Sequence, residues 1–408
     1  MIKIILVETR TIKKQHVLYV LLDCLLFLSK NLYNSTLYAV RQHYFKTGEY
    51  LNYNAVNKFF TDEDQQDYRA LPAKVSKLVQ MLVDQNFKSF FALLKKKEKG
   101  EYNLPVNIPG YLDKVKGRQV LLYTSQALKR SRKGFIGLSG TDIWIETDKN
   151  VKFVRLVPNN GSINIEIGYE TECSPWKAGA TAAMDLGLGN LGTIVLPNDR
   201  AFIVNGKPLK SINQYYNKEL AKEKSYISRF KTDGGNERRF SNKIQRLHNK
   251  RNKKVKDYMH KASRMIVNHL VSKGVSDFVI GYNKGWKQDI NIGKKNNQKF
   301  VQVPFKKFIG MLIYKCGLKG IRVHIQEESY TSKCSFFDNE PIRKHSTYQG
   351  KRVKRGLFKT SHGLLLNADV NGALNILKKH CQKVAWNDDQ SSDYVEVCST
   401  PLVSTIKY

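Results

Sequence analysis

The order of strand-like and helix-like segments after residue 180 constrains the fold more than any other feature of this chain. The segment "GATAAMDLGLGNLGTIVLP" predicts a strand, a tight glycine-rich turn and a second strand. A long basic helix over 238–272 follows, then the strand "SDFVIGYN", a helix near "VPFKKFIGMLIYKCGLKG", the strand "IRVHIQEE" and a helix entered through "LLLNADVNGALNILKK". This alternation predicts an α/β domain over 179–386.

The part of the chain before this domain has a different pattern. Residues 1–14 alternate like a strand, 15–97 carry apolar residues at helical spacing, and 98–178 contain short strands between Gly, Asn and Asp turns. We expect 1–14 and 98–178 to form a small antiparallel β-barrel or sheet, with the helices inserted into it. The polar residues 387–408 are predicted to form a tail.

The charge of the chain predicts a polyanionic partner. Lys and Arg number 69 against 35 Asp and Glu, a formal net charge of +34. Nucleic acid is the commonest partner for such an excess, and a membrane surface is the alternative. The best apolar run, "VLYVLLDCLLFLSK", is too short to span a bilayer, so we expect no membrane. Scattered cysteines and the lack of a signal peptide favour a reducing, cytoplasmic location.

Two aspartates stand where an element of the α/β domain begins or ends. Asp185 closes an apolar strand before a glycine-rich turn, from which a carboxylate can project into a crevice. A simple turn residue, or the phosphate-binding hairpin of an actin-like ATPase, would look the same. Asp369 stands at the mouth of a helix, where an ordinary N-cap aspartate is the alternative.

Taken together in a basic protein, these acids suggest a Mg²⁺ site for phosphodiester chemistry. Carboxylates are the hard ligands that Mg²⁺ prefers, and two ions roughly 3.5–4 Å apart can activate water and stabilise a leaving oxygen. Two ions call for a third carboxylate. The strand "DFVIGYN" ends on Gly281 without one, but the next strand ends on Glu327 and Glu328. Since side chains alternate along a strand, only one of that pair is expected to reach the site.

Several motifs resemble one family. "MDLGLGNLGTIV", "VIGYNKGWKQDINIGKKNNQKFVQVPF", "EESYTSKCSFFD", "KRVKRGLF" and "NADVNGALNI" closely resemble the OrfB or TnpB proteins of insertion sequences, relatives of type V CRISPR effectors and Fanzor proteins. The resemblance implies an RNase H-like (RuvC) nuclease domain and a wedge-type barrel carrying a helical recognition domain. It also implies a guide RNA and a double-stranded DNA target that is unwound to single strands.

The family pattern carries over to specific residues. It implies that Asp185, Glu328 and Asp369 are catalytic and hold two Mg²⁺ ions. Usual members carry the middle glutamate at the end of the strand matching "DFVIGYN", and this chain departs from that pattern. It is similar to the branch, shared with Fanzor proteins, whose glutamate lies on the next strand just before the Thr-Ser of "YTS". Glu328 fits that position best, with Glu327 in reserve.

A structural zinc site is not expected. Relatives often follow "YTS" with two Cys-x-x-Cys pairs, but here Cys334 stands alone. A tetrahedral thiolate site needs about four ligands, and neither His345 nor His362 replaces the missing ones. Residues 331–362 are therefore predicted to be a degenerate form of the zinc-ribbon insert.

Three basic segments are candidates for nucleic-acid contact: the long helix, the loop after "DFVIGYN", and the stretch "IRKHSTYQGKRVKRG". A solvated helix face, a loop anchored by its tryptophan and a free charged loop are the respective alternatives. The predicted contacts are Lys250, Arg251, Lys254, Lys284, Trp286, Lys287, Lys351, Arg352 and Arg355.

The sequence thus predicts an RNA-guided, Mg²⁺-dependent DNA endonuclease that reads a short motif beside its target. A nuclease-inactive, RNA-guided repressor is the main alternative. A DNA-joining transposase and an ATPase that works without nucleic acid are further ones. The oligomeric state, the guide and the adjacent motif are not predicted.

Overall fold

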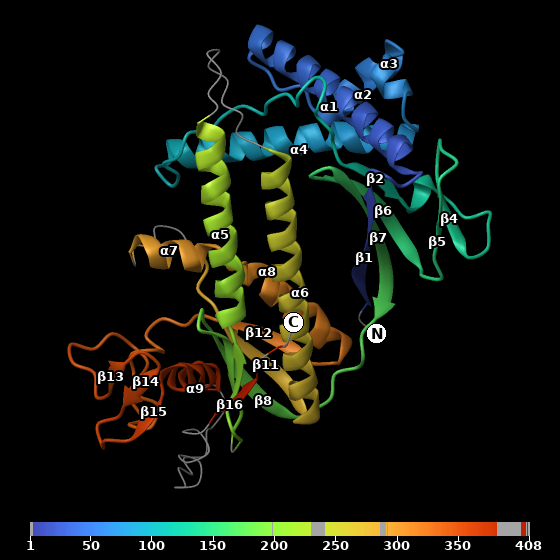
Figure 1. Cartoon of the computed structure of the whole chain (residues 1–408). Coiled ribbons are helices and arrows are strands. Elements are labelled where there is room, and N and C mark those ends of the chain that lie inside the picture. Colours follow the sequence, from blue (N-terminus) through green and yellow to red (C-terminus); the bar gives the residue numbers. More distant parts are fainter. Residues whose placement is uncertain are drawn as a thin grey trace. The chain divides into compact units, whose positions relative to one another are not determined.

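The computed structural model describes residues 3–197, 199–229, 241–285, 291, 293–381, 401–404 and 406 (Figure 1). The chain divides into two compact units, Lys3–Thr171 and Glu172–Tyr408. The division falls a few residues before the boundary at 178 expected from the sequence. Each unit has a hydrophobic core of its own.

The N-terminal unit combines helices with two sheets. Its larger sheet has the order β1-β7-β6-β2, so the first strand of the chain lies beside the last strand of the unit. The helices between β1 and β2 share one core with the sheet strands. The strands of the larger sheet are β1 (Lys3–Lys13), β2 (Leu121–Thr124), β6 (Val151–Asn159) and β7 (Ser162–Glu172), and the helices are α1 (Tyr19–Thr47), α2 (Tyr53–Asp62), α3 (Gln66–Arg69) and α4 (Ala73–Glu98).

The expected barrel does not close within the described residues. After a short 3-10 turn, η1 (Ser125–Ala127), three strands pair only with one another, in the order β3-β4-β5. Because these strands satisfy their hydrogen bonds locally, β1 and β2 are left at opposite edges of the larger sheet. The three strands are β3 (Leu128–Lys129), β4 (Phe135–Leu138) and β5 (Trp144–Glu146).

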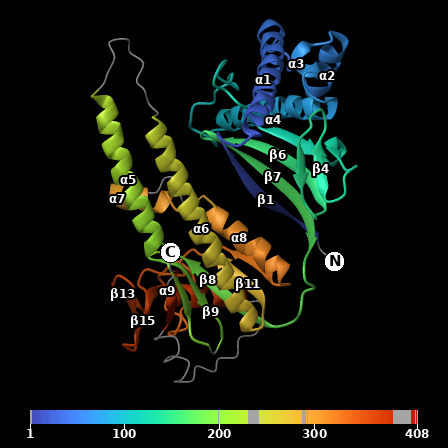
Figure 2. The same ribbon diagram turned by 45° about the vertical axis from the view of Figure 1, so that its right-hand side comes forward.

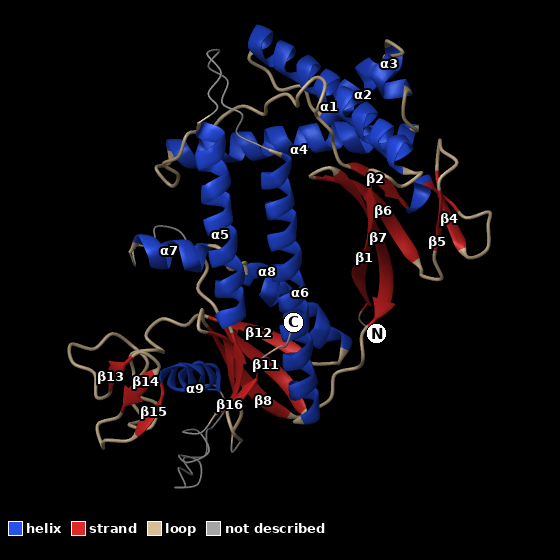
Figure 3. Cartoon of the chain, in the orientation of Figure 1, coloured by secondary structure: helices blue, strands red, loops and turns tan. Residues whose placement is uncertain are grey.

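The C-terminal unit is built on a six-stranded sheet with the order β12-β11-β8-β9-β10-β16 (Figure 3). The first three strands in sequence are antiparallel, and β11 and β12 then run parallel to β8 on its other side. Together with the helices between its strands, this sheet makes the unit the α/β domain expected from the sequence. The strands are β8 (Ala180–Leu186), β9 (Asn190–Val195), β10 (Phe202–Asn205), β11 (Val275–Gly281), β12 (Arg322–Gln326) and β16 (Leu402–Ser404).

Helices cover both faces of this sheet. Apolar residues of α6 and α8 form one core with alternate residues of β8 and β11, and α9 packs on the opposite face. Helix α5 lies along α6 (Figure 2). The helices are α5 (Lys207–Ser228), α6 (Asn242–Ser272), α7 (Lys294–Val301), α8 (Phe305–Leu318) and α9 (Ala368–Cys381), and a small sheet, β13 (Lys351–Lys354), β14 (Leu357–Lys359) and β15 (Leu365–Asn367), leads into α9.

The prediction that the C-terminal residues form a tail is partly wrong. Leu402, Val403 and Ser404 pair in parallel with β10 and complete the edge of the sheet, and Ile406 is buried. The backbone of β10 offers an open edge, which the backbone of these three residues extends. Residues 387–400 of the predicted tail lie outside the described part of the chain. No helix among the described residues is long and apolar enough to cross a membrane.

Candidate active site

The sheet brings three sequence segments to one edge. Strands β8, β11 and β12 are parallel neighbours, so their carboxyl ends meet at the same side of the sheet. Asp185 lies at the end of β8, Gly281 at the end of β11, and Glu328 two residues beyond β12. These are the segments in which the sequence places candidate carboxylates.

Asp185 faces α9. Ala183, two residues earlier on the strand, belongs to the core beneath α9, whereas the adjacent Met184 belongs to the core on the opposite face. Because side chains alternate along a strand, Asp185 faces α9 as Ala183 does. Gly372 makes the approach of the two elements possible, because a Cβ at that position would lie 3.2 Å from Asp185 Oδ2.

Asp369 lies in the first turn of α9 but does not cap that helix. The side chain of Asn367 does so instead: its Oδ1 accepts hydrogen bonds from the backbone N–H groups of Asp369 (2.9 Å) and Val370 (3.4 Å). The Asp369 carboxylate is therefore free to face the sheet. It accepts hydrogen bonds from Asn190 Nδ2 at 2.8 Å and from the guanidinium of Arg352 at 3.4 Å.

Of the two adjacent glutamates, only Glu328 turns inward. Glu327 is exposed, pairs with Lys379 and accepts a hydrogen bond from the Ser329 N–H at 2.8 Å. Glu328 is held at its backbone, where its N–H donates to Asn283 Oδ1 (3.0 Å) and its carbonyl accepts from Thr331 Oγ1 (2.8 Å).

The glycine at the end of β11 provides the space that Glu328 uses. A Cβ added to Gly281 would lie 2.8 Å from Glu328 Oε2 and 2.4 Å from Ile376 Cδ1. Gly281 is the end of the strand on which the usual TnpB pattern carries its glutamate. The carboxylate of Glu328 thus reaches, from the neighbouring strand, the place where a side chain at 281 would begin.

The charges of the other two acids act on Asp185. Burial, followed by the charges of Asp369 and Glu328, raises the pKa of Asp185 well above its usual range. Burial and the adjacent Glu327 raise the pKa of Glu328 to about 7. Glu328 Oε2 is also buried without a hydrogen-bond partner. A cation bound at this edge would stabilise the ionised carboxylates of Asp185 and Glu328 and would give Glu328 Oε2 a partner.

The donor set therefore fits Mg²⁺ in kind. Carboxylate oxygens gather at one sheet edge, one of them without a partner, and Asn190 adds an amide beside them. The side chains do not form a complete metal-coordination site, because no three His, Cys, Asp or Glu residues in the described ranges are placed to hold one ion together. What the structure supplies is the location and the excess of negative charge.

The insert after Thr331 is held by hydrogen bonds. Cys334 is buried, and its thiol lies 3.5 Å from the carbonyl oxygen of Pro341. The carboxylate of Glu340, 2% exposed, accepts from the backbone N–H groups of Ser335 (2.8 Å) and Gln349 (3.1 Å). No cluster of metal-binding side chains is found among the described residues of this insert.

The predicted basic contacts divide into three groups. Lys250, Lys254, Lys284, Lys351, Arg352 and Arg355 are exposed, and Trp286 and Lys287 lie outside the described residues. Arg251 is only half-buried and stays a predicted contact, although it already has structural partners. Its Nε donates to Asn213 Oδ1 (2.9 Å) and its Nη2 to the Gln302 carbonyl (2.7 Å), so its donors are used in joining α6 to neighbouring segments.

Several asparagines around the site were missed by the sequence analysis. Asn371 and Asn375, both buried in α9, donate to the Cys334 carbonyl at 2.9 and 2.7 Å and fix the insert to the helix. Asn190 and Asn283 touch Asp369 and Glu328, as described above. The only sequence signal was the run "NADVNGALN", whose asparagines recur at helical spacing on an otherwise apolar face.

Comparisons with known proteins agree with this architecture. Residues 164–287 match the OrfB family model described as a probable transposase, and 305–376 match a "Cas12f1-like, TNB domain". The TnpB-like protein ORF457 of Acidianus two-tailed virus is 25% identical over 401 residues, covering 86% of this chain and 81% of that protein. A solved Cas12f1–sgRNA–target DNA complex is similar with a TM-score of 0.52, at 14% identity, over 88% of this chain and 82% of that one.

The α/β fold is accordingly similar to that of the solved Cas12f1 protein. The two family matches and the viral relative confirm the resemblance to TnpB-type proteins expected from the motifs.

Proposed function

We propose that this chain is an RNA-guided DNA endonuclease that depends on Mg²⁺. The observation that carries the proposal is the meeting of Asp185, Glu328 and Asp369 at one edge of the sheet, with the space at Gly281 filled by the Glu328 carboxylate. The net charge of +34 and the exposed lysines around the sheet support nucleic acid as the partner. The similar Cas12f1 structure is a complex with guide RNA and target DNA, and we infer the same classes of partner here.

Each acid has a distinct support in this arrangement. Asp185 is fixed by its strand, Asp369 by the capped start of α9, and Glu328 by the loop that Asn283 and Thr331 hold. When bound by these carboxylates, Mg²⁺ would supply a Lewis acid for the phosphate and a more acidic water. Arg352, 52% exposed and 3.4 Å from Asp369, would contact a phosphate that approaches the acids.

The test is cleavage of a supercoiled plasmid carrying a guide-matched target. The RNA that co-purifies with the protein is sequenced first, because a single species ending in a variable segment supplies the guide. We expect the wild type to cut in Mg²⁺, and Asp185→Ala, Glu328→Ala and Asp369→Ala to fall to background while RNA binding is retained.

Glu327→Ala is the matched control for Glu328→Ala. The two residues are adjacent acids, but Glu327 points outward to Lys379, so its loss should leave cleavage near normal. Cutting by the Glu328→Ala protein would refute the assignment of Glu328. A wild-type protein that binds guide and target without cutting would support the repressor instead.

A further inference from the structure

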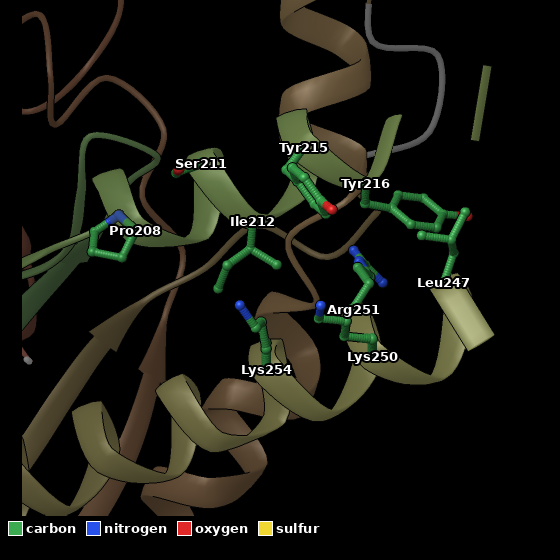
Figure 4. Close-up of a pocket in the computed structure, with 9 residues that line it drawn as sticks. All are labelled: Pro208, Ser211, Ile212, Tyr215, Tyr216, Leu247, Lys250, Arg251 and Lys254. Carbon is green, nitrogen blue, oxygen red and sulfur yellow. The ribbon is translucent and has the colours of Figure 1, made fainter. Parts of the chain in front are cut away.

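A pocket that no part of the proposed reaction uses lies between α5 and α6 (Figure 4). Its volume is about 450 Å³, within the range of pockets that take small organic groups. Tyr215 and Ile212 extend into it from α5, and Lys250 and Lys254 approach from α6. None of the three acids lines it.

The inner wall of the pocket is fixed before any ligand arrives. The hydroxyl of Tyr216 lies 2.9 Å from His248 Nδ1, which joins the two helices. Arg251 is anchored to Asn213 and Gln302, and its guanidinium lies 5.8 Å from the Tyr216 ring centre. A pocket with such a wall loses little conformational entropy when it binds.

Among the described residues, the outer groups of the pocket have no such partners. Tyr215 is 56% exposed, although a tyrosine ring is a costly group to leave in water. Lys250 and Lys254 are exposed, form no ion pair with an acid within the described ranges, and no acidic residue lines the pocket. One open aromatic face across the pocket from two ammonium groups matches a flat ring joined to phosphates.

We propose that this pocket binds one unpaired nucleobase of a single-stranded nucleic acid. The base stacks on Tyr215 against the apolar side chain of Ile212, and Lys250 and Lys254 contact the flanking phosphates. The proposal rests on the proposed function only in requiring that the chain bind nucleic acid. It requires neither cleavage nor metal.

The test separates stacking from charge. The full-length chain, freed of bound nucleic acid in high salt, is titrated in EDTA with labelled oligothymidylate of about 12 nucleotides and with an abasic strand of the same length and charge. Tyr215→Ala should weaken binding of the thymidylate about 5- to 100-fold and leave the abasic strand unchanged. Tyr215→Phe, which keeps the ring, should bind like the wild type.

The lysines should behave in the opposite way. Lys254→Ala should lower the affinity for both strands alike. It should also reduce the steepness of the fall of log affinity with log salt concentration by about 0.7. The same titrations with oligouridylate show whether RNA, DNA or both supply the base.

Tyr226→Ala is the matched control, since Tyr226 is a 58%-exposed tyrosine on the same helix outside the pocket. It should bind both strands like the wild type. Any of three results would overturn the proposal. Tyr215→Ala could leave the affinity for the thymidylate unchanged, or it could lower the affinity for the abasic strand equally. Alternatively, Tyr226→Ala could lower the affinity for the thymidylate as much as Tyr215→Ala does. If Tyr215→Ala lowers the affinity as expected but the wild-type protein does not cut DNA, the proposal for this pocket stands and only the proposed nuclease function fails.

Discussion

Among single residues, Gly281 determines where the third carboxylate can stand. A side chain there and Glu328 in its observed position exclude each other, because the added Cβ would approach Glu328 Oε2 to 2.8 Å. Backbone and side-chain atoms do not tolerate contacts of this kind without movement. Gly281 is therefore part of the positioning of Glu328, although it carries no functional group.

Gly281→Ala should lower cleavage about 10- to 100-fold, because a displacement of about 1 Å at a catalytic group costs that much. Gly310→Ala is the control: a Cβ at Gly310 meets nothing within 4 Å, and alanine favours the interior of α8. Initial rates of plasmid cleavage compare the two variants. Equal rates for Gly281→Ala and the wild type would show that Glu328 is not held by this space.

Asp277 is a second residue whose surroundings lead to a measurable effect. Arg322 contacts both of its oxygens (2.8 and 2.9 Å) and His324 Nε2 lies 2.8 Å away. Although burial opposes the shift, these bonds and that of Ser276 lower the pKa of Asp277 to about 2. A lowered folded-state pKa stabilises the protein above the unfolded pKa and ceases to do so as the pH falls through about 2.

Asp277→Asn should therefore cost about 1–2 kcal/mol of unfolding free energy at pH 7, after allowance for the exposure of Arg322. The difference from the wild type should stay constant down to about pH 4 and then shrink toward pH 2. Urea unfolding at several pH values measures it. A difference that grows on acidification would contradict the charge-based account.

Residue positions were predictable where they coincide with the ends of elements. Asp185 and Asp369 follow from a strand end and a helix start. Strand alternation predicted only that one of Glu327 and Glu328 turns inward, and the family resemblance selected Glu328. The use of Arg251 was not predictable. A charged stripe on a helix does not show whether a guanidinium is already bonded to a neighbouring element, as Arg251 is to Asn213.

At the scale of elements, helix α5 was missed by the sequence analysis. Its start carries a recognisable signal, Pro208 in the first turn after Gly206, and Leu209, Ile212, Tyr216 and Leu220 follow at helical spacing, so the signal was present in the sequence. The strand β16 was missed for another reason. Three residues have no periodicity of their own, and only the open edge of β10 makes them a strand.

The insert over 331–362 should keep its structure without zinc. Glu340 bonds two backbone N–H groups, so Glu340→Ala should lower the unfolding free energy by about 1–3 kcal/mol by leaving buried donors unpaired. The zinc chelator phenanthroline should leave the melting temperature of the wild type unchanged. A fall in melting temperature with chelator, or stoichiometric zinc in the purified protein, would refute this account.

Across the whole molecule, the excess of positive charge acts on stability as well as on binding. A net charge of +34 repels itself, and a polyanion that binds the folded chain relieves that repulsion. The sequence alone predicted this property, because it depends on composition and not on the arrangement of elements.

Heparin should therefore raise the melting temperature at low ionic strength, and the gain should disappear in high salt. Neutral dextran of similar size is the control and should have little effect. Thermal unfolding followed by circular dichroism reports both. An unchanged or lowered melting temperature with heparin at low salt would show that the charge excess is not concentrated on the folded surface.

The pairing of β11 with β12 places Gly281 opposite Gln326, two residues before Glu328. Under the proposed function, an acid just beyond one strand would thus serve a site at the end of its neighbour, because the carboxylate of Glu328 occupies the space left by Gly281. A survey that looks for a glutamate at the single aligned position of Gly281 would class such a chain as inactive. A comparison of the positions of carboxylate oxygens in superposed structures would instead group it with the proteins that carry three acids.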